Sequence, residues 1–481
     1  MNKMNVIMLI IDALRADHLG LYGYDKNTSP NIDRLAKEGV VFENAFSCTN
    51  ATDPSLTTIF SGKYPISHGI RNHGNKITIN ELQSFYRNNI TLLSEILKDN
   101  GYRTIGIDWL GRWHKKGFEY YLGNEEQRNR NPASIIRFVG KMINKLPESY
   151  SGRLRRIYGK IYRKKSNIVR YNARELVDKS IELIRSHNLD KPFFLFIHFW
   201  DTHTPYNAPK EIYEELRPQN GVQYLDSVLD TIGNELWKNT LRRMFAGLET
   251  VEEVVARYDA AIKYVDQEIG RLIEFLEDQG LFEETIFIIT SDHGESLTEH
   301  GILFDHHGLY DVSIKVPLIM SNIPFPHAKR IKSLVQHIDI VPTVLDLLGI
   351  PYKEYDFDGM SLVPLMEEEL SSLRSFIVAE EHYTQNKIAI RTDEWKYIYS
   401  PSESDAKCRY CSRIHGGVEE LYHLESDPHE NHNVVKAEPE IAERLKKQLF
   451  EFMTYLEHKK TKQEKTIISK KIRDLKLKGK I

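Results

Sequence analysis

Two carboxylates and an imidazole follow two apolar runs that lie far apart in the chain. The first run, VIMLII at 6–11, ends at Asp12, and the second, TIFIIT at 285–290, is followed by Asp292 and His293 within the tetrapeptide SDHG. Both runs have the length and continuous apolar character of strands buried inside a parallel sheet. The carboxyl ends of such strands form the ligand-binding edge of an open α/β sheet. These three side chains can therefore converge on one divalent cation.

Strand and helix patterns alternate along the chain from residue 5 to about residue 375. Strands that alternate with helices imply a parallel sheet covered on both faces. After residue 375, short apolar runs separated by turn residues predict an antiparallel sheet, followed by a helix near 438–456. The predicted parts are a main domain (1–375) with a basic helical insertion at about 125–172 and a second helical insertion at about 207–260, a C-terminal α+β subdomain (376–457) and a basic tail (458–481), loose or helical only in part.

Composition bounds the class of protein. The 481 residues are 41% hydrophobic, which is typical of a soluble protein with a large core, and no apolar run approaches the roughly 18 residues of a membrane helix. The first residues run directly into the strand that ends at Asp12, so we expect no signal peptide. Three cysteines cannot form a disulfide framework. These observations predict a cytoplasmic protein.

Charge is strongly segregated although the net charge is only −3. Residues 128–170 contain 13 Lys and Arg and one acid, Glu148. The simplest interpretation is a solvated helical hairpin. Apolar residues at helical spacing beside basic ones also fit a helix that lies on an anionic membrane surface, or a surface that steers a polyanionic substrate. No nucleic-acid partner is expected.

Further motifs occur in the order and at the spacing of one known family. They are DALRADHLG at 12–20, ATDPSLTTIFSGKYP at 51–65, GRWH at 111–114, WDTHTPY at 200–206 and SDHGE at 291–295. With these motifs, the chain resembles the sulfatase family of the alkaline phosphatase superfamily over nearly its whole length. The resemblance implies a mixed, mostly parallel α/β sheet sandwiched by helices, with a smaller C-terminal antiparallel sheet plus helix, and makes 1–375 the catalytic domain.

One departure from the family pattern decides the expected nucleophile. Type sulfatases convert a cysteine to formylglycine within a Cys-x-Pro-Ser-Arg element, and this chain has TDPSL at 52–56. Thr52 stands at the cysteine position and Leu56 at the arginine position, whereas Cys48 is four residues too early. A threonine here resembles phosphoryl-transferring relatives such as lipoteichoic acid synthase and the nucleotide pyrophosphatase/phosphodiesterases.

The resemblance implies one divalent metal ion held by Asp12, Thr52, Asp292 and His293. Three oxygens and one imidazole suit Mn, Mg, Ca or Zn, and the donor set does not choose among them. Ala13 stands where type sulfatases usually have a second Asp, which weakens the case for calcium. Contact with the ion would make the threonine hydroxyl a better nucleophile.

The resemblance also implies residues around the transferring group, which is part of an anionic ester. These residues are Arg112 and His114 to neutralise charge, His203 as the general acid, His306 or His307 on the substrate, and Lys63 and His68 near the nucleophile.

Two further metal sites are not favoured. A second metal held by Asp201, His203 and His307 is one alternative. The other is a zinc site at Cys408, Cys411 and His415, which lacks a second Cys pair.

Three functions fit these residues. A hydrolase of sulfuric, phosphoric or phosphonate esters is favoured. A transferase that passes a phosphoryl-linked group to an alcohol is the second, but export-type transferases of this superfamily carry membrane helices. The third, a non-catalytic binding protein, conflicts with the retention of Asp12, Thr52, Asp292 and His293. The fold does not decide between sulfate and phosphate.

Overall fold

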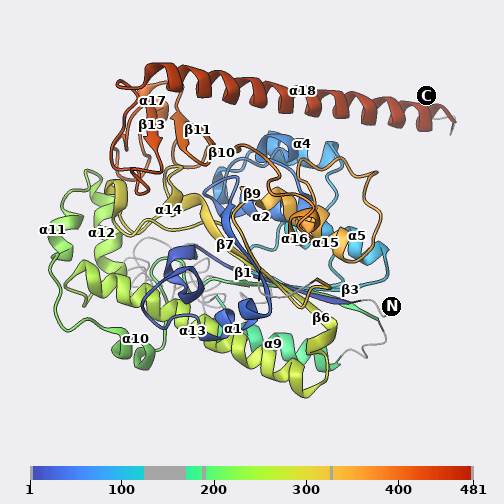
Figure 1. Cartoon of the computed structure of the whole chain (residues 1–481), viewed down its shortest axis with the longest axis horizontal. Helices are drawn as coiled ribbons and strands as arrows, with labels where there is room; N and C mark the ends of the chain where they lie inside the picture. Colours follow the sequence, from blue (N-terminus) through green and yellow to red (C-terminus); the bar gives the residue numbers. More distant parts are fainter. Residues whose placement is uncertain (1–3, 124–169, 187–190, 326–328, 478–481) are drawn as a thin grey trace, which may run out of the picture.

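A large sheet with helices on both faces and a smaller sheet at one end make up the protein (Figure 1). The structure, a computed structural model, describes residues 4–123, 170–186, 191–325 and 329–477. The large sheet has the strand order β4-β3-β5-β1-β6-β7-β2-β8, with β9 paired to β2. Only β7 among these described strands is antiparallel to its neighbours, β6 and β2. The strands of the large sheet are β1 (Asn5–Ile11), β2 (Gly39–Phe46), β3 (Arg103–Ile107), β4 (Tyr120–Leu122), β5 (Phe193–Phe199), β6 (Thr285–Thr290), β7 (Lys315–Ser321), β8 (Lys329–Ile331) and β9 (Val335–Gln336).

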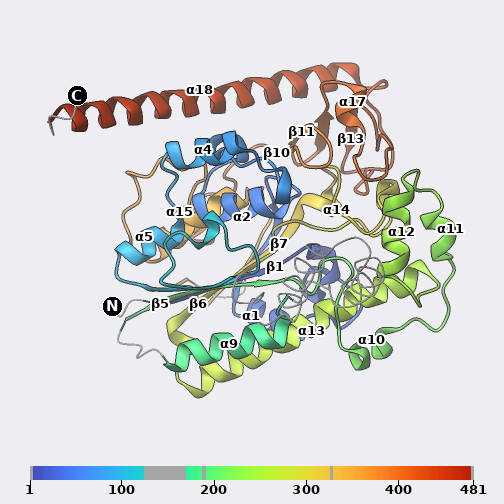
Figure 2. The same cartoon turned by 180° about the vertical axis from the view of Figure 1, so that it is seen from behind.

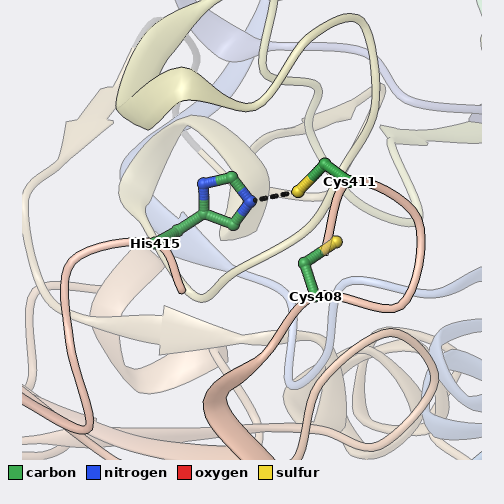
Figure 3. A group of neighbouring side chains, drawn as sticks. All are labelled: Cys408, Cys411 and His415. Atoms are coloured by element: carbon green, nitrogen blue, oxygen red, sulfur yellow. Dashed lines mark hydrogen bonds between the residues drawn. The ribbon is translucent and has the colours of Figure 1, made fainter. Parts of the chain in front are cut away.

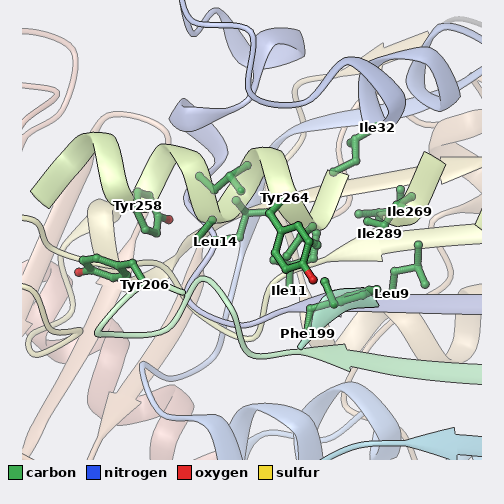
Figure 4. Packing of buried hydrophobic residues seen from close by; sticks show 14 of the residues in the cluster. Leu9, Ile11, Leu14, Ile32, Phe199, Tyr206, Tyr258, Tyr264, Ile269 and Ile289 are labelled. Atoms are coloured by element: carbon green, nitrogen blue, oxygen red, sulfur yellow. The ribbon is translucent and has the colours of Figure 1, made fainter. Parts of the chain in front are cut away.

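Each face of the large sheet packs against its own set of helices. On β1, Ile7 and Leu9 belong to the cluster that contains Tyr258 of α13, part of which Figure 4 shows. Met8 and Ile10, on the opposite face, pack in the cluster that contains α2. Burial on both faces explains why the strand runs are apolar throughout. The helices are α1 (Pro30–Lys37), α9 (Ala173–Ser186) and α13 (Val251–Asp278) on one face, and α2 (Thr52–Ser61), α4 (Ile79–Arg87), α5 (Leu93–Asp99), α15 (Ile340–Leu347) and α16 (Val363–Met366) on the other.

The C-terminal part is a four-stranded antiparallel sheet covered by one long helix, α18 (Pro439–Leu477). Together with the mostly parallel large sheet, it confirms the predicted fold class. The helix is longer than expected, because it continues through the predicted tail to Leu477 and lies along the outside of the molecule (Figure 2). Residues of high helix propensity continue past Leu456, the last α18 residue in the buried cluster, and favour the longer helix. Lys459 Nζ, in this extension, binds Asp358 Oδ1 at 2.7 Å. The strands are β10 (Ile377–Glu381), β11 (Lys387–Arg391), β12 (Trp395–Tyr399) and β13 (Glu419–His423).

The two predicted insertions differ in how far the structure describes them. The basic insertion at about 125–172 falls almost wholly on residues 124–169, which lie outside the described residues. The second, at about 207–260, contains α10 (Lys210–Leu216), α11 (Leu225–Leu229), α12 (Glu235–Met244) and the first turns of α13. Within the described ranges, none of the helices combines the length and the apolar character that crossing a membrane requires.

Replacing Leu449 tests the attachment of α18. Leu449 is fully buried against Ile390 and Tyr397 of the small sheet, whereas its neighbour Phe450 is 39% exposed. We expect Leu449→Ala to lower the free energy of unfolding by about 2–5 kcal/mol, because it leaves a cavity in this cluster. Urea unfolding followed by circular dichroism measures the change. Phe450→Ala is the control, and an equal loss in both variants would contradict the packing described.

Candidate active site

Parallel strand ends bring Asp12, Asp292 and His293 together. Strands β1 and β6 are parallel neighbours with Ile10 opposite Thr290, so the segments that follow them leave the sheet at the same edge. One ligand atom from each of the three side chains lies within 4.8 Å of the others. His293 Nε2 is 3.2 Å from Asp292 Oδ2 and 3.9 Å from Asp12 Oδ1. The arrangement is the one that the strand pattern predicts.

The loops after the two strands lock each other in place. The Ala13 N–H donates to Asp292 Oδ1 at 3.1 Å, and the Leu14 N–H donates to Ser291 Oγ at 2.8 Å. From α13, the hydroxyl of Tyr258 donates to the Ala13 carbonyl at 2.7 Å. These bonds fix the backbone on both sides of the carboxylates, so little reorganisation is needed to present them together.

The chemistry of this cluster fits a divalent cation. Both oxygens of Asp12 and Oδ2 of Asp292 are buried and accept no hydrogen bond from the described residues. Buried carboxylate oxygens without a partner are costly, and a bound cation removes that cost. Burial and the neighbouring Asp292 raise the pKa of Asp12 well above its usual value. Asp12, Asp292 and His293 thus have the free donor atoms of a metal centre.

His293 is held in the form that a metal ligand requires. Its Nδ1–H donates to the Gly294 carbonyl at 2.9 Å, which leaves the Nε2 lone pair directed at the two carboxylates. Burial lowers the pKa of the ring to about 3 in spite of the nearby Asp292, so the ring is neutral above that pH.

Thr52 lies at the start of α2, beside His293. It is the first residue of that helix, almost fully buried, and its Oγ1 is 3.4 Å from His293 Nε2. The helix is anchored to the same strand end, because Ser55 Oγ donates to the Asp292 carbonyl at 2.6 Å. The N-terminal end of a helix also carries partial positive charge, which favours a developing alkoxide there.

The residue after Thr52 organises Arg112. Asp53 Oδ2 accepts from Arg112 Nη1 at 2.7 Å and lies 2.8 Å from His73 Nδ1. His114 is buried, with Nε2 3.3 Å from the Asp53 carbonyl oxygen, and therefore faces the first turn of α2. Arg112 is thus held at the first turn of α2 by Asp53, and His114 contacts the same turn.

A row of imidazoles extends from the cluster. The ring of His306 stacks on His293 with 4.0 Å between centroids, and His203 lies 6.0 Å beyond His306. Burial and the nearby Arg170 lower the pKa of His203 to about 4. Of the predicted substrate residues, His306 is therefore the one that lies against the cluster.

Two predicted substrate residues have other partners. Lys63 follows the far end of α2, about 15 Å from Thr52 along the helix, and its Nζ donates to the Asp356 carbonyl. His68 Nε2 is 3.1 Å from Thr58 Oγ1 and braces the middle of α2. Both residues therefore contact segments that lie beyond Thr52 along the chain, and their role near the nucleophile stays a prediction.

His307 also faces away from the cluster. Its ring lies between Asp305 and Cys408, with Nε2 2.9 Å from Asp305 Oδ2 and Nδ1 3.3 Å from Cys408 Sγ. His307 therefore does not share a site with Asp201 and His203, the other donors of the alternative second metal.

The structure adds residues that the sequence interpretation left out. His198, near the end of β5, has Nδ1 2.8 Å from Asp108 Oδ1 and Nε2 3.7 Å from Asp12 Oδ2. Arg170 stacks over Trp200 with 3.9 Å to the ring centroid, and its charge acts on Asp12. Asp108 directly follows β3, so the strand-end rule that found Asp12 could have found both Asp108 and His198.

Replacing Asp12 tests the metal centre. We expect Asp12→Asn to raise the melting temperature of metal-free protein above pH 7, because it removes a buried carboxyl group whose raised pKa destabilises the fold once the group must ionise. The gain in melting temperature on adding Mn²⁺ should be lost, as should bound metal measured by mass spectrometry. Exposed Asp25→Asn is the control; Asp12→Asn protein that binds metal like the wild type would rule out this centre.

Comparison with known proteins places the chain in a family. Residues 4–350, more than half of the chain, match the sulfatase family, and residues 298–457 match the C-terminal region of N-sulphoglucosamine sulphohydrolase. A sulfatase of Formosa agariphila is 26% identical over 89% of this chain and 82% of its own length, and an arylsulfatase of Clostridium perfringens is 25% identical over 92% of each. A phosphonate monoester hydrolase of Agrobacterium radiobacter shares the fold, with a TM-score of 0.64 and 19% identity over 94% of this chain and 96% of that one. The chain belongs to the sulfatase family of ester hydrolases, within the alkaline phosphatase superfamily.

Proposed function

We propose that this protein is a metal-dependent hydrolase of sulfuric, phosphoric or phosphonate esters in which Thr52 is the nucleophile. The observation that carries the proposal is the 3.4 Å separation between Thr52 Oγ1 and His293 Nε2, beside two carboxylates of which three oxygens accept no hydrogen bond from the described residues. Cys48 does not support a shifted register, because it packs in the C-terminal cluster, 3.4 Å from Gln336 Nε2. In this proposal the chain differs from the type sulfatases by a change of nucleophile.

Asp12, Asp292, His293 and Thr52 hold the metal in this proposal. When bound, a divalent cation lowers the pKa of a hydroxyl that it contacts and withdraws charge from the transferring group. The identity of the ion stays open among Mn, Mg, Ca and Zn. A single ion is proposed, because His307 faces Asp305 and Cys408.

The chain's own residues divide the reaction into two steps. In the first, Thr52 Oγ gives its proton to solvent and forms a bond to sulfur or phosphorus. The bond to the ester oxygen breaks, and that oxygen leaves with the electron pair and takes a proton from the protonated ring of His203. In the second, neutral His203 takes a proton from the attacking water as the water oxygen bonds to sulfur or phosphorus, and Thr52 Oγ leaves with the electron pair and takes a proton from solvent.

Positive charge in the site favours an anionic group without deciding between sulfate and phosphate. Arg112, fixed by Asp53, can bind two oxygens of the transferring group in a fork, and Arg170 adds a second guanidinium whose charge acts on Asp12. The two groups differ by one charge and have the same tetrahedral shape. The observation that favours phosphoryl chemistry as the second candidate is the threonine itself. Attraction to an anionic membrane surface or polyanion through 128–170 stays a prediction.

Replacing Thr52 tests the nucleophile. We expect Thr52→Ala to abolish turnover of both p-nitrophenyl sulfate and p-nitrophenyl phosphate while the circular dichroism spectrum is unchanged. Thr52→Ser is the matched variant and should retain activity, because it keeps the hydroxyl. Mass spectrometry of acid-quenched wild-type protein should find the sulfo or phospho group on the peptide that contains Thr52. Turnover by Thr52→Ala protein would eliminate the mechanism.

Replacing His203 tests the acid. We expect His203→Gln to lower kcat/KM for alkyl esters by about 10²–10⁴-fold, because an alkoxide leaves poorly without a proton. The loss should be far smaller for p-nitrophenyl esters, whose leaving group needs none. Because the pKa of His203 is about 4 in the free protein, kcat/KM for alkyl esters should rise as the pH falls below neutral, and this rise should be absent in the variant. His423→Gln, on β13, is the control; equal losses for both ester types would refute the acid role.

A further inference from the structure

A second group of metal-type donors lies outside the candidate active site, in the loop between β12 and β13. Cys408, Cys411 and His415 each offer one ligand atom, and these atoms lie within 4.8 Å of one another (Figure 3). All three side chains are buried, and the two cysteines are free thiols. Their spacing, C-x₂-C followed by x₃-H, is that of half of a zinc-binding motif.

The loop is folded as a tight turn around the two sulfurs. The Ser412 N–H donates to the Cys408 carbonyl at 2.9 Å, and the Cys408 N–H donates to the Arg413 carbonyl at 2.7 Å. A β-bridge joins Lys407 and Ile414 on either side of the turn. The backbone therefore holds both thiols on the same side without help from a disulfide.

A fourth donor lies beside this group, on a distant part of the chain. His307 Nδ1 lies 3.3 Å from Cys408 Sγ, although it is not within 4.8 Å of all three other ligand atoms, and His415 Nε2 lies 2.9 Å from Cys411 Sγ. In a tetrahedral zinc site the ligand atoms are about 3.3–3.8 Å apart, because Zn–S and Zn–N bonds are about 2.3 and 2.0–2.1 Å long. Closing such a site therefore requires the His307 ring to shift toward the other donors and the contact between Cys411 and His415 to lengthen. The sequence interpretation rejected zinc because it found no second Cys pair; two histidines take that place.

His415 is held as a metal-bound histidine usually is, because its Nδ1 lies 3.0 Å from the His300 carbonyl oxygen. His307 Nε2 lies 2.9 Å from Asp305 Oδ2, close enough for an ion pair but without an aligned hydrogen bond among the described residues. A carboxylate or carbonyl on the far nitrogen fixes the tautomer and leaves the other lone pair for the metal. Two buried thiols and two imidazoles by themselves would not require this arrangement.

We propose that Cys408, Cys411, His415 and His307 bind one zinc ion in a closed structural site, separate from the metal centre at Asp12. Two sulfurs and two nitrogens in tetrahedral array are the donor set that zinc prefers, and four protein ligands leave no position for a substrate. On binding, the two thiols release their protons and the ion holds two thiolates.

The zinc site links the C-terminal part to the candidate active site. His307 follows His306, whose ring stacks on His293. Tyr410, inside the Cys turn, stacks on His307 with 5.2 Å between centroids and packs on Trp237 of α12 at 5.0 Å. The ion thus ties the loop that carries His306 to the small sheet and to α12, and positions that loop without touching the substrate.

Cobalt substitution of the full chain tests the site. Wild-type protein reconstituted with Co²⁺ should show a sulfur-to-cobalt charge-transfer band in the near ultraviolet and the intense visible bands of a tetrahedral ion. The centre at Asp12 offers no sulfur and cannot give the first band. The band should persist in the Asp12→Asn variant, so failure of the proposed hydrolase centre and failure of this site are distinguishable. Absence of the band from folded, reduced wild-type protein, or a Cys408–Cys411 disulfide found by mass spectrometry of native protein, would overturn the proposal.

Variants locate the ligands. We expect Cys408→Ser/Cys411→Ser to lose one zinc per chain and the charge-transfer band, and His307→Ala to shift the visible bands and release zinc faster to a chelator. Cys48→Ser, which removes the third buried cysteine, is the matched control and should keep both zinc and band. A His307→Ala spectrum identical to that of the wild type would remove His307 from the ligand set and refute the four-ligand site.

Discussion

Repulsion between two buried carboxylates is the constraint on which the candidate active site depends. Asp12 and Asp292 leave adjacent parallel strands at the same edge, and three of their four oxygens have no hydrogen-bond partner among the described residues. Hydrogen bonds from the Ala13 and Leu14 N–H groups to the loop after β6 hold the two loops together in spite of that repulsion. A bound cation would resolve the conflict, and the same cation would make the neighbouring threonine more reactive. The stability of the two buried carboxylates and the reactivity of Thr52 would therefore depend on the same bound cation.

Features that depend on strand geometry were the ones best predicted from the sequence. Asp12, Asp292 and His293 were found because parallel strands end together, and the alternation of strands and helices predicted the mixed sheet. For Lys63 and His68, the contacts found are with the Asp356 carbonyl and with Thr58, because α2 carries the chain away from Thr52. His198 and Asp108 were missed although they lie at the ends of β5 and β3, because no family motif or residue spacing marks them in the sequence.

Contacts between distant segments could not be predicted in this way. The pairing of His307 with Cys408 joins residues about a hundred positions apart, and no local pattern indicates it. The helical continuation of α18 through the lysine-rich tail depends on local propensity and on contacts such as Lys459 with Asp358. The loop that contains His306 and His307 illustrates the same point, because one side of it lies against His293 and the other against the sulfurs.

Ala13 has a backbone conformation with a consequence for ion selectivity. Its φ of 57° lies in the left-handed region, which aspartate and asparagine occupy more readily than most other residues with a side chain. Type sulfatases usually carry an aspartate at the corresponding position. The main chain of this loop would therefore accept an aspartate at this position without added backbone strain, so exchanging one side chain could supply a further oxygen donor with the scaffold around it unchanged.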